Sequence, residues 1–327
     1  MCMTRTIVGV LRGGASSEYD LSLKTGSAVM QALPEDAYAI RDILIDKSGA
    51  WNVQGRSMDP VRALQGIDVV FNALHGNTGE DGKVVRILER AGVPYTGGRP
   101  HGLRNSLNKI TTRQLLQKEG IRMPRSVSFS AVEDLTTADL ARLVFNTFGP
   151  PYVVKPVSGS FSSGVRFVSS LPELPDALGD VLDDHEMVVV EEFVQGKEIS
   201  VGVIDNFRDI DVYALSPAEV MCTDEGVCIT GRAWREGMLN MTCPTPSLSS
   251  EHKEQATEIA QKAHQALGLS GYSSVDFIST PRGVYVLEVD ALPGLYQGAP
   301  FPVMLEGVGS SVPEFIEHAI AQARRGY

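Results

Sequence analysis

Apolar residues in the first third of the chain form short runs that alternate with segments of helical spacing. The short runs predict strands, and the spaced segments predict helices that end at proline or glycine. The predicted strands are residues 6–11, 67–74 and 93–96, and the predicted helices are residues 21–33 and 84–90. This alternation favours a parallel α/β sheet, whose ligands bind at the carboxyl ends of the strands. Two polar loops, residues 13–18 and 75–82, fall at those ends.

The rest of the chain has a different pattern. Helices are predicted over residues 106–120, 130–147, 250–267 and 311–325. Short connections predict antiparallel pairing among strands at residues 152–155, 165–168, 187–191 and 198–204. We expect three domains, at residues 1–107, 108–193 and 194–327.

Composition narrows the class of protein. The chain has 327 residues and a net charge of −11, and it contains no basic cluster. These features argue against a nucleic-acid partner and against binding to an anionic membrane. No apolar run is as long as a membrane-spanning helix, and the N-terminus does not have the pattern of a signal peptide. The four cysteines lack zinc-binding spacing, so we expect free thiols and a cytoplasmic protein.

The most informative segment, residues 284–294, reads as a strand that becomes acidic before it ends. Glu288 and Asp290 are two residues apart and therefore share a face of the strand. Asp276, in a run just upstream, supplies a third carboxylate in a similar setting. Three carboxylates at the ends of neighbouring strands suit Mg²⁺, with nucleotide phosphates completing its coordination. The alternative is that these acids are ordinary strand-end residues that face water.

A lysine and the small-residue loop behind it are candidates for phosphate binding. Lys155 ends an apolar strand, where its ammonium either reaches water or meets an anion. The loop at residues 157–164 contains Ser160 and Ser162, and its backbone N–H groups are accessible to phosphate oxygens. The alternative for this loop is a flexible hairpin connection.

Two further segments are candidates for ligand binding. Residues 188–198 read as strand, connector and strand; the connector can offer backbone groups to an adenine edge, and a carboxylate shortly after it can bind ribose. A plain domain linker is the alternative. Glu18, in a loop without GxGxxG spacing, is a candidate for binding a substrate ammonium. His75, at the end of a predicted core strand, is either a structural histidine or a catalyst.

Taken in order, these segments resemble the D-alanine–D-alanine ligase family of the ATP-grasp superfamily. The resemblance spans nearly the whole chain and rests on four motifs in the family's order. They are residues 11–18 with Ser22 and Leu23, residues 73–76 followed by 79–82, residues 94–97 followed by Lys109, and residues 287–290 with Pro293 and Gly294. The resemblance implies a three-domain ATP-grasp fold: an N-terminal Rossmann-like parallel α/β domain, a central α+β ATP-binding domain and a C-terminal α+β domain that binds metal.

The resemblance also implies a reaction. A carboxylate attacks the γ-phosphate of ATP and becomes an acyl phosphate. An amine then attacks the acyl carbon, so that an amide forms and ADP and phosphate are released. This is phosphoryl transfer catalysed by positioning and charge neutralisation. The implied cofactors are ATP and two Mg²⁺ ions, with Mn²⁺ as a substitute.

The family roles carry over to individual positions of this sequence. Lys109 and Lys155 would neutralise the α- and β-phosphates, and Asp276, Glu288 and Asp290 would hold the two metal ions. The other implied nucleotide-binding residues are Ser160, Ser162, Glu191 at the adenine amino group, Glu192, Phe193, Val194 through its backbone, Glu198 at the ribose, and Leu287. Glu18 and His75 would anchor the ammonium of the first amino acid, and the backbone N–H of Gly294 would stabilise the tetrahedral oxyanion.

Several positions depart from the family pattern. Ser274 stands where the family has an Arg that supports the oxyanion and the product carboxylate. Ala299 stands where a Ser binds the carboxylate of the second substrate, and Asp290 replaces an Asn. On the lid, residues 230–235 replace a Tyr-Glu-Ala-Lys-Tyr segment. Arg232 or Arg235 could replace its Lys as an anion clamp, whereas Trp234 cannot replace its Tyr in proton transfer.

These departures lead to a hypothesis about substrates. Removing a hydrogen-bond donor to a buried charge costs on the order of 1–3 kcal/mol. We therefore expect an ATP-dependent carboxylate–amine ligase that keeps the nucleotide and first-substrate sites but uses a different amine acceptor. The expected protein is a homodimer with small amino acid substrates that serves peptidoglycan or secondary-metabolite peptide biosynthesis. The alternatives are another ATP-grasp ligase or cyclising ligase, and a non-catalytic ATP-binding regulator.

Overall fold

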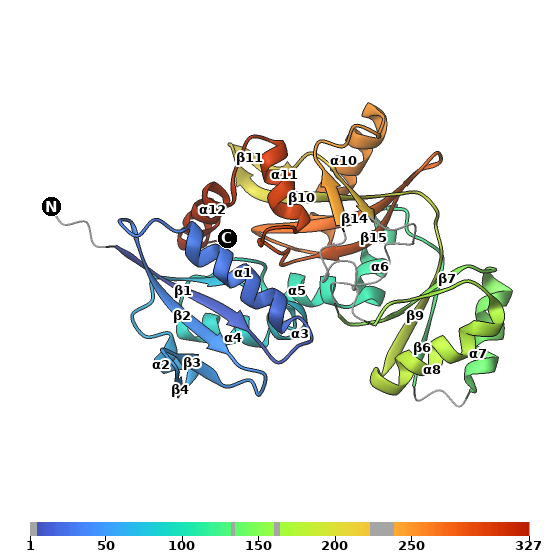
Figure 1. The fold of residues 1–327 in the computed structure, drawn as a ribbon, viewed down its shortest axis with the longest axis horizontal. Helices are drawn as coiled ribbons and strands as arrows, with labels where there is room; N and C mark the ends of the chain where they lie inside the picture. Colours follow the sequence, from blue (N-terminus) through green and yellow to red (C-terminus); the bar gives the residue numbers. More distant parts are fainter. Residues whose placement is uncertain (1–4, 132–134, 160–163, 223–238, 327) are drawn as a thin grey trace.

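Three β-sheets organise the chain in sequence order, and Figure 1 shows the units they form. The computed structural model describes residues 5–131, 135–159, 164–222 and 239–326. The N-terminal unit and the middle unit lie at opposite ends of the molecule, and the C-terminal unit lies between them (Figure 1).

The N-terminal unit is built on a five-stranded sheet with the order β4-β3-β2-β1-β5. Its strands are β1 (Thr6–Gly13), β2 (Tyr38–Ile45), β3 (Trp51–Val53), β4 (Arg56–Met58) and β5 (Val69–Asn72). Its helices are α1 (Tyr19–Ala32), α2 (Pro60–Ala63), α3 (Gly76–Glu80) and α4 (Lys83–Ala91). β1 pairs in parallel with both β2 and β5, as predicted, whereas β3 and β4 pair antiparallel at the β2 edge, so the sheet is mixed. The predicted strand at residues 93–96 is reduced to one parallel bridge between Val70 and Tyr95.

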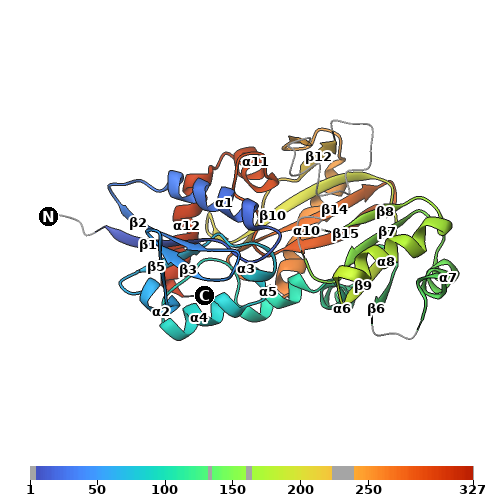
Figure 2. The same cartoon turned by 60° about the horizontal axis from the view of Figure 1, so that its bottom comes forward.

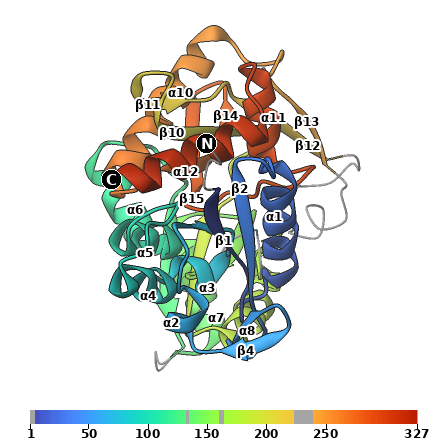
Figure 3. The ribbon, with the colours of Figure 1, turned by 90° about the vertical axis from the view of Figure 1, so that its left-hand side faces the viewer.

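Both faces of this sheet are covered. Val8, Val10 and Leu11 of β1 are fully buried, as expected for a parallel strand with helices on either side. α1 packs on one side of β1, and the last helix of the chain, α12 (Val312–Arg325), contacts α1 and β5. Figure 3 shows α12 between the N-terminal and C-terminal sheets.

Two helices connect the N-terminal unit to the middle unit. They are α5 (Pro100–Leu107) and α6 (Lys109–Lys118). The predicted single helix over residues 106–120 is wrong, because Asn108 has extended backbone and caps α6. Its side chain accepts hydrogen bonds from the backbone N–H groups of Ile110 and Thr111. An asparagine in this position satisfies N–H groups that a continuous helix would bond internally.

The middle unit has a four-stranded antiparallel sheet with the order β6-β9-β7-β8. Its elements are β6 (Ser126–Ser130), α7 (Thr137–Thr147), β7 (Tyr152–Pro156), β8 (Arg166–Val168), a short 3₁₀ turn (Leu171–Glu173), α8 (Leu174–Asp184) and β9 (Met187–Glu192). The predicted helix over residues 130–147 begins only at Thr137, where Thr136 and Asp139 form a capping box. Figure 2 shows α7 and α8 at the end of the molecule remote from the N-terminal unit.

The C-terminal unit contains the largest sheet, with the order β13-β12-β10-β14-β15 and β11 beside β10. Its strands are β10 (Lys197–Phe207), β11 (Ile210–Ala214), β12 (Ala218–Cys222), β13 (Leu239–Thr242), β14 (Tyr272–Thr280) and β15 (Gly283–Asp290). The helices that follow or pack on it are α10 (Ser250–Ala266), α11 (Pro300–Gly307) and α12. The chain passes from the middle sheet to this sheet between β9 and β10.

The apolar cores divide unequally among the units. One large cluster joins residues of the N-terminal sheet, such as Val10 and Phe71, to residues of the C-terminal sheet, such as Val201 and Phe277. The middle unit has a separate cluster around α7, α8 and the inner strands. None of the described helices combines the length and the hydropathy that a bilayer crossing requires.

Candidate active site

The three predicted metal-binding carboxylates lie on one face of the C-terminal sheet. The register pairs Asp276 of β14 with Glu288 of β15 and with Ser200 of β10. Two residues along β14, Ser274 pairs with Asp290. Because directly paired residues share a face of a sheet, these residues form two adjacent rows on one surface.

An irregularity in β15 determines which of its side chains lie on this surface. Leu287 has no partner in the register, because Asp276 pairs with Glu288 and the next residue, Phe277, pairs with Val286. A strand without this extra residue would place Val286 and Glu288 on the same face. Val286 is fully buried in the core, whereas Glu288 is only partly buried. The bulge therefore separates the apolar and acidic halves of the strand.

The carboxylates of this surface are electrostatically crowded. Burial, with the charge of Glu288 adding to it, raises the pKa of Asp276 to about 6, although Ser200 Oγ donates a 2.6 Å hydrogen bond to Asp276 Oδ1. Burial and the neighbouring carboxylates raise the pKa of Asp290 to about 7. Burial and Asp276 raise the pKa of Glu198 to about 8. A cation bound here would relieve this repulsion.

Carboxylate oxygens are the donor set that Mg²⁺ prefers, so the residues present fit this ion. Among the described residues, no three His, Cys, Asp or Glu side chains converge into a preformed metal site. Mg²⁺ commonly takes only one or two protein carboxylates together with substrate phosphates. The surface is therefore suited to a metal ion that arrives with a nucleotide.

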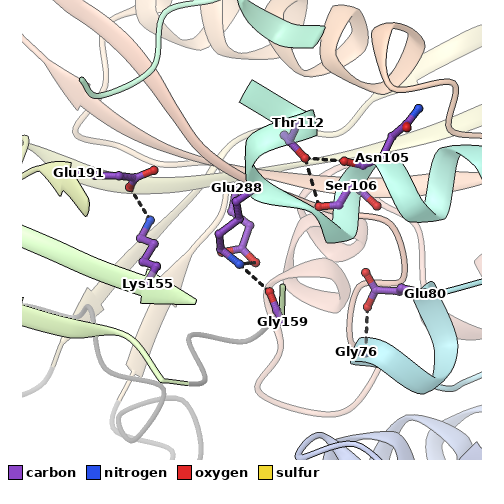
Figure 4. A network of polar contacts seen from close by, with 10 residues as sticks. Gly76, Glu80, Asn105, Ser106, Thr112, Lys155, Gly159, Glu191 and Glu288 are labelled. Atoms are coloured by element: carbon purple, nitrogen blue, oxygen red, sulfur yellow. Dashed lines mark hydrogen bonds and ion pairs between the residues drawn. The ribbon is translucent and has the colours of Figure 1, made fainter. Parts of the chain in front are cut away.

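A buried ion triad faces this surface from the middle unit. Glu191 of β9 accepts from Lys155 Nζ at 2.7 Å through one carboxylate oxygen and from Arg113 Nη2 at 2.5 Å through the other. Burial alone would lower the pKa of Lys155 and raise that of Glu191, but their mutual attraction outweighs burial, so both groups stay charged. Figure 4 shows Glu288 between the Lys155–Glu191 pair and Glu80 of the N-terminal unit.

The second predicted phosphate-binding lysine lies at the start of α6. Lys109 Nζ donates to the carbonyl of Gly159 at 2.6 Å and lies 3.8 Å from Glu288 Oε1. Its backbone N–H bonds the carbonyl of Val157, which ties α6 to the small-residue loop. Ser160 and Ser162 of that loop lie outside the described residues, as do Arg232, Trp234 and Arg235 of the predicted lid.

Sequence reasoning missed Arg113, which occupies the charged centre of the site. The sequence feature that could have identified Arg113 is its position four residues after Lys109, because residues four apart in a helix lie on the same face. Both Glu191 oxygens bind cations in this structure, yet each carboxylate oxygen can accept a further hydrogen bond. The predicted contact of Glu191 with an adenine amino group stays a prediction.

The connector after β9 is held in place by its neighbours. The Phe193 N–H donates to the carbonyl of Pro151 at 3.0 Å, and its ring meets the Phe167 ring edge-to-face at 5.2 Å between ring centres. Glu192 forms an ion pair with Arg125 at 2.7 Å. Val194 is partly buried. The connector is thus fixed against the residue before β7 and against β8.

The two N-terminal loops fit closely against each other. Gly14, at φ +107°, has no room for a side chain because a Cβ atom would lie 2.9 Å from Thr78. Gly76, at φ +61°, lies directly against the carboxylate of Glu18. Only glycine allows both this backbone conformation and this close approach. The contact places buried Glu18 beside the loop that carries His75.

His75 and Glu80 complete the N-terminal side of the site. His75 Nε2 shares a 2.8 Å hydrogen bond with Thr25 Oγ1, and burial lowers the pKa of His75 to about 4, so it is neutral at pH 7. Glu80, which the sequence reasoning passed over, accepts from the Gly76 N–H at 2.9 Å. Burial and the charge of Asp290 raise the pKa of Glu80 well above its ordinary value.

The positions predicted for the second substrate offer few free polar groups. Ser274 Oγ is 2.9 Å from Ser200 Oγ, and that hydroxyl in turn bonds Asp276. Ala299 is buried in a small apolar cluster with Leu21 and Tyr296. Gly294 lies against the Tyr296 ring, where a Cβ atom on Gly294 would come within 2.7 Å of Tyr296 Cε1.

Comparison with known proteins places this geometry in context. The family model described as D-ala D-ala ligase C-terminus matches residues 115–321, and that described as D-ala D-ala ligase N-terminus matches residues 52–98. The D-alanine--D-alanine ligase of Carboxydothermus hydrogenoformans is 31% identical over 321 residues, which are 98% of each chain. That of Geobacter sulfurreducens is 33% identical over 97% of this chain and 94% of the relative.

Solved structures give the same picture. The D-alanine--D-alanine ligase from Bacillus anthracis complexed with ATP has a TM-score of 0.80 at 28% identity and covers 98% of both chains. The VanG D-Ala:D-Ser ligase from Enterococcus faecalis has a TM-score of 0.82 at 25% identity, covering 98% of this chain and all of that chain. The predicted three-domain ATP-grasp architecture is confirmed by these matches.

Proposed function

The chain belongs to the D-alanine–D-alanine ligase family of ATP-dependent carbon–nitrogen ligases, and we propose that it joins an activated amino acid to an acceptor other than D-alanine. The carboxylate of the first amino acid would attack the γ-phosphate of ATP, and the acceptor would displace phosphate from the acyl phosphate. The observation that supports the activation step is the acidic surface of Asp276, Glu288 and Asp290 opposite Lys109 and Lys155. The altered acceptor rests on Ser274 and Ala299.

The proposed triphosphate site lies between these opposite charges. Lys109 already spans the gap, because its ammonium contacts Gly159 on one side and lies 3.8 Å from Glu288 on the other. Lys155 is buried and stays charged through its contact with Glu191. Two fixed ammonium groups can neutralise phosphate charge without reorganisation during the reaction. Phe193 and Val194 border the space that we assign to the adenine ring, and Glu198 is assigned to the ribose.

We infer that Mg²⁺ binds with the nucleotide. Asp276, Glu288 and Asp290 would hold the ions, which supply charge neutralisation at the transferring phosphate. The raised pKa values of Asp276 and Asp290 support this role, because a bound cation would favour their ionised forms. Binding of a metal–nucleotide complex would therefore release protons from the protein.

The first amino acid is assigned to the N-terminal loops. Glu18 is buried and would bind the substrate ammonium. His75 is neutral at pH 7, so it would offer a hydrogen bond without adding a positive charge that repels the ammonium. The crowded carboxylates of Glu80 and Asp290 make this end of the site favourable for a cationic group.

The acceptor end supports a change of second substrate. The Ser274 hydroxyl already forms a hydrogen bond with Ser200, and Ala299 has no polar side-chain atom. An acceptor carboxylate at these two positions would lose one or two donors, at a cost of about 1–3 kcal/mol each. The structurally similar VanG protein, described as a D-Ala:D-Ser ligase, supports the view that this architecture accommodates acceptors other than D-alanine.

The test is a steady-state assay of phosphate release with ATP, Mg²⁺ and D-alanine as the first substrate. The acceptors are D-alanine, D-serine, D-lactate and ammonia, with products identified by mass. Phosphate release with D-alanine alone is the baseline, because D-alanine can also act as the acceptor. We expect a kcat/KM for one of the other acceptors at least about tenfold above that for D-alanine. Asp276→Asn is the inactive control.

Two results would contradict this proposal in different ways. Efficient synthesis of D-alanyl-D-alanine with no better acceptor would remove the altered specificity and leave the ligase. ATP binding without phosphate release for any acceptor would favour a regulator over an enzyme.

The setting of the reaction is also a proposal. We propose that the enzyme acts in the cytoplasm on small amino acids, in peptidoglycan or secondary-metabolite peptide synthesis, as a homodimer. The net charge of −11 supports the absence of nucleic-acid and membrane partners.

A further inference from the structure

A buried tyrosine hydroxyl beside the acceptor end of the site has no assigned role. Tyr296 is only 8% exposed, and among the described residues its hydroxyl has no hydrogen-bond partner. Leaving a buried hydroxyl unpaired is energetically unfavourable, so such a group calls for an explanation. Tyr152, in the core of the middle unit, is the other buried tyrosine whose hydroxyl lacks a partner in the described part of the chain.

The position of Tyr296 relates it to the reaction. Its ring packs against Gly294, and its backbone carbonyl accepts the Ala299 N–H at 3.0 Å. Asp290, at the end of the acidic surface, lies close enough to influence the hydroxyl electrostatically. Tyr296 thus contacts both Gly294, assigned to the oxyanion, and Ala299, at the position assigned to the acceptor carboxylate.

The chemistry of the hydroxyl suits an anionic group. Burial, with the charge of Asp290, raises the pKa of Tyr296 to about 12, so the hydroxyl keeps its proton and can donate it in a hydrogen bond. Lys24 of α1 holds its ammonium 5.7 Å from the centre of the same ring. A carboxylate next to Tyr296 would therefore meet a hydrogen-bond donor and a nearby positive charge, and the cation assigned to Asp290 would offset the repulsion from that carboxylate.

We propose that Tyr296 binds the carboxylate of the acceptor amino acid by donating its hydroxyl hydrogen bond. This inference rests on the proposed function, and it adds the group that supplies a donor where Ala299 and Ser274 supply none. Tyr296 is thus a specificity-determining residue, and its loss affects acceptor binding more than the activation of the first amino acid.

The experiment compares Tyr296→Phe with the wild-type enzyme, using whichever of D-alanine and D-serine is the better acceptor. We expect the acceptor KM to rise about tenfold, with kcat and the KM for ATP changed less than about twofold. Tyr152→Phe is the matched control, because it removes the same unpartnered hydroxyl far from the acceptor end and leaves the acceptor KM unchanged. The double variant Tyr296→Phe/Ala299→Ser adds a hydroxyl in the same small cluster and should recover part of the acceptor KM.

The outcomes separate the inference from the proposed function. An unchanged acceptor KM in a folded Tyr296→Phe enzyme would overturn the role of Tyr296 while ligation stands. A wild-type preference for ammonia, which has no carboxylate, would do the same. A wild-type protein that ligates no acceptor would overturn the proposed function, and the role of Tyr296 with it. Thermal melting of each variant checks folding, and the double variant reports on the hydroxyl if Tyr296→Phe alone is unstable.

Discussion

Glu191 is the residue on which the charges of the nucleotide side depend. It is 3% exposed and forms ion pairs with both Lys155 and Arg113. Burying either positive charge alone would be energetically unfavourable, and the single carboxylate of Glu191 offsets this cost for both Lys155 and Arg113. The triad therefore fixes the Lys155 ammonium at the place where a phosphate is expected.

Glu191→Gln preserves the shape of the side chain and removes its charge. Two buried cations would then face each other without compensation, so we expect the free energy of unfolding to fall by about 3–5 kcal/mol. The KM for ATP should rise, because Lys155 loses the contact that holds it. Urea denaturation and initial-rate kinetics measure the two effects.

Glu192→Gln is the matched control on the neighbouring position. Glu192 pairs with Arg125, whose side chain is 62% exposed, and such surface pairs contribute about 0–1 kcal/mol. Equal losses of stability in the two variants would show that the buried triad has no special energetic role.

Residue chemistry in the sequence anticipated part of this site and not the rest. Lys155 and the three carboxylates stand next to apolar strands, where the change from apolar to charged residues is visible in the sequence. Arg113 has only its helical spacing from Lys109 as a local signal, because its importance comes from Glu191, which is distant in sequence. The importance of Tyr296 comes from the burial of its hydroxyl. A buried unpartnered hydroxyl is a property of the packed structure alone.

At the scale of elements, β15 contributes to the apolar core and, beyond its bulge, also to the acidic surface. Its core residues are Val284 and Val286 before the bulge and Val289 after it. The apolar pattern changes from even to odd positions at Leu287, and this change of phase is present in the sequence. The prediction assumed an uninterrupted alternation of side chains along the strand. It therefore placed Glu288 and Asp290 on the same face correctly, but it missed the bulge that separates them from the core residues.

The break between α5 and α6 is the element that places Lys109. Asn108→Ala removes the side chain that caps α6, and the loss of such a cap costs about 1 kcal/mol. Lys109 is the first residue of α6, so fraying there displaces the ammonium from Gly159 and Glu288. We expect Asn108→Ala to raise the KM for ATP several-fold, which corresponds to the roughly 1 kcal/mol lost with the cap.

Ser249→Ala provides the comparison for this element. Ser249 caps α10 through the His252 N–H, and none of the residues assigned to the nucleotide lies on that helix. Its removal should cost a similar free energy of unfolding and leave the KM for ATP unchanged. If both variants changed the KM for ATP equally, the cap at Asn108 would have only a general effect on stability.

Elements with strong periodicity were predicted well, and those with mixed signals were not. α1, α4, α10 and α12 lie within a few residues of their predicted bounds. β6 was missed because Ser126–Ser130 is rich in serine, and its strand form depends on pairing with β9. Tertiary pairing overrides weak local preference in such segments.

At the scale of the whole molecule, the apolar cores predict which units unfold together. The large cluster spans the N-terminal and C-terminal sheets and includes Leu103 of α5. The cluster of the middle unit, which includes Leu178 of α8, is separate. The acidic surface therefore lies on one apolar core, and the Lys155–Glu191 pair belongs to a unit with a separate core.

Two core substitutions test this division by native-state hydrogen exchange. Leu178 and Leu103 are both fully buried, and replacing either by Ala should cost about 2–5 kcal/mol locally. Leu178→Ala should accelerate exchange of the slow amides in β7 and β9 and leave those of β1 and β14 unchanged. Leu103→Ala should accelerate amide exchange in both β1 and β14, because side chains of the two strands belong to one apolar cluster. If Leu178→Ala accelerated amide exchange equally in all four strands, the three units would unfold as one. An analogue of ATP with Mg²⁺ could then not stabilise the middle unit independently of the others.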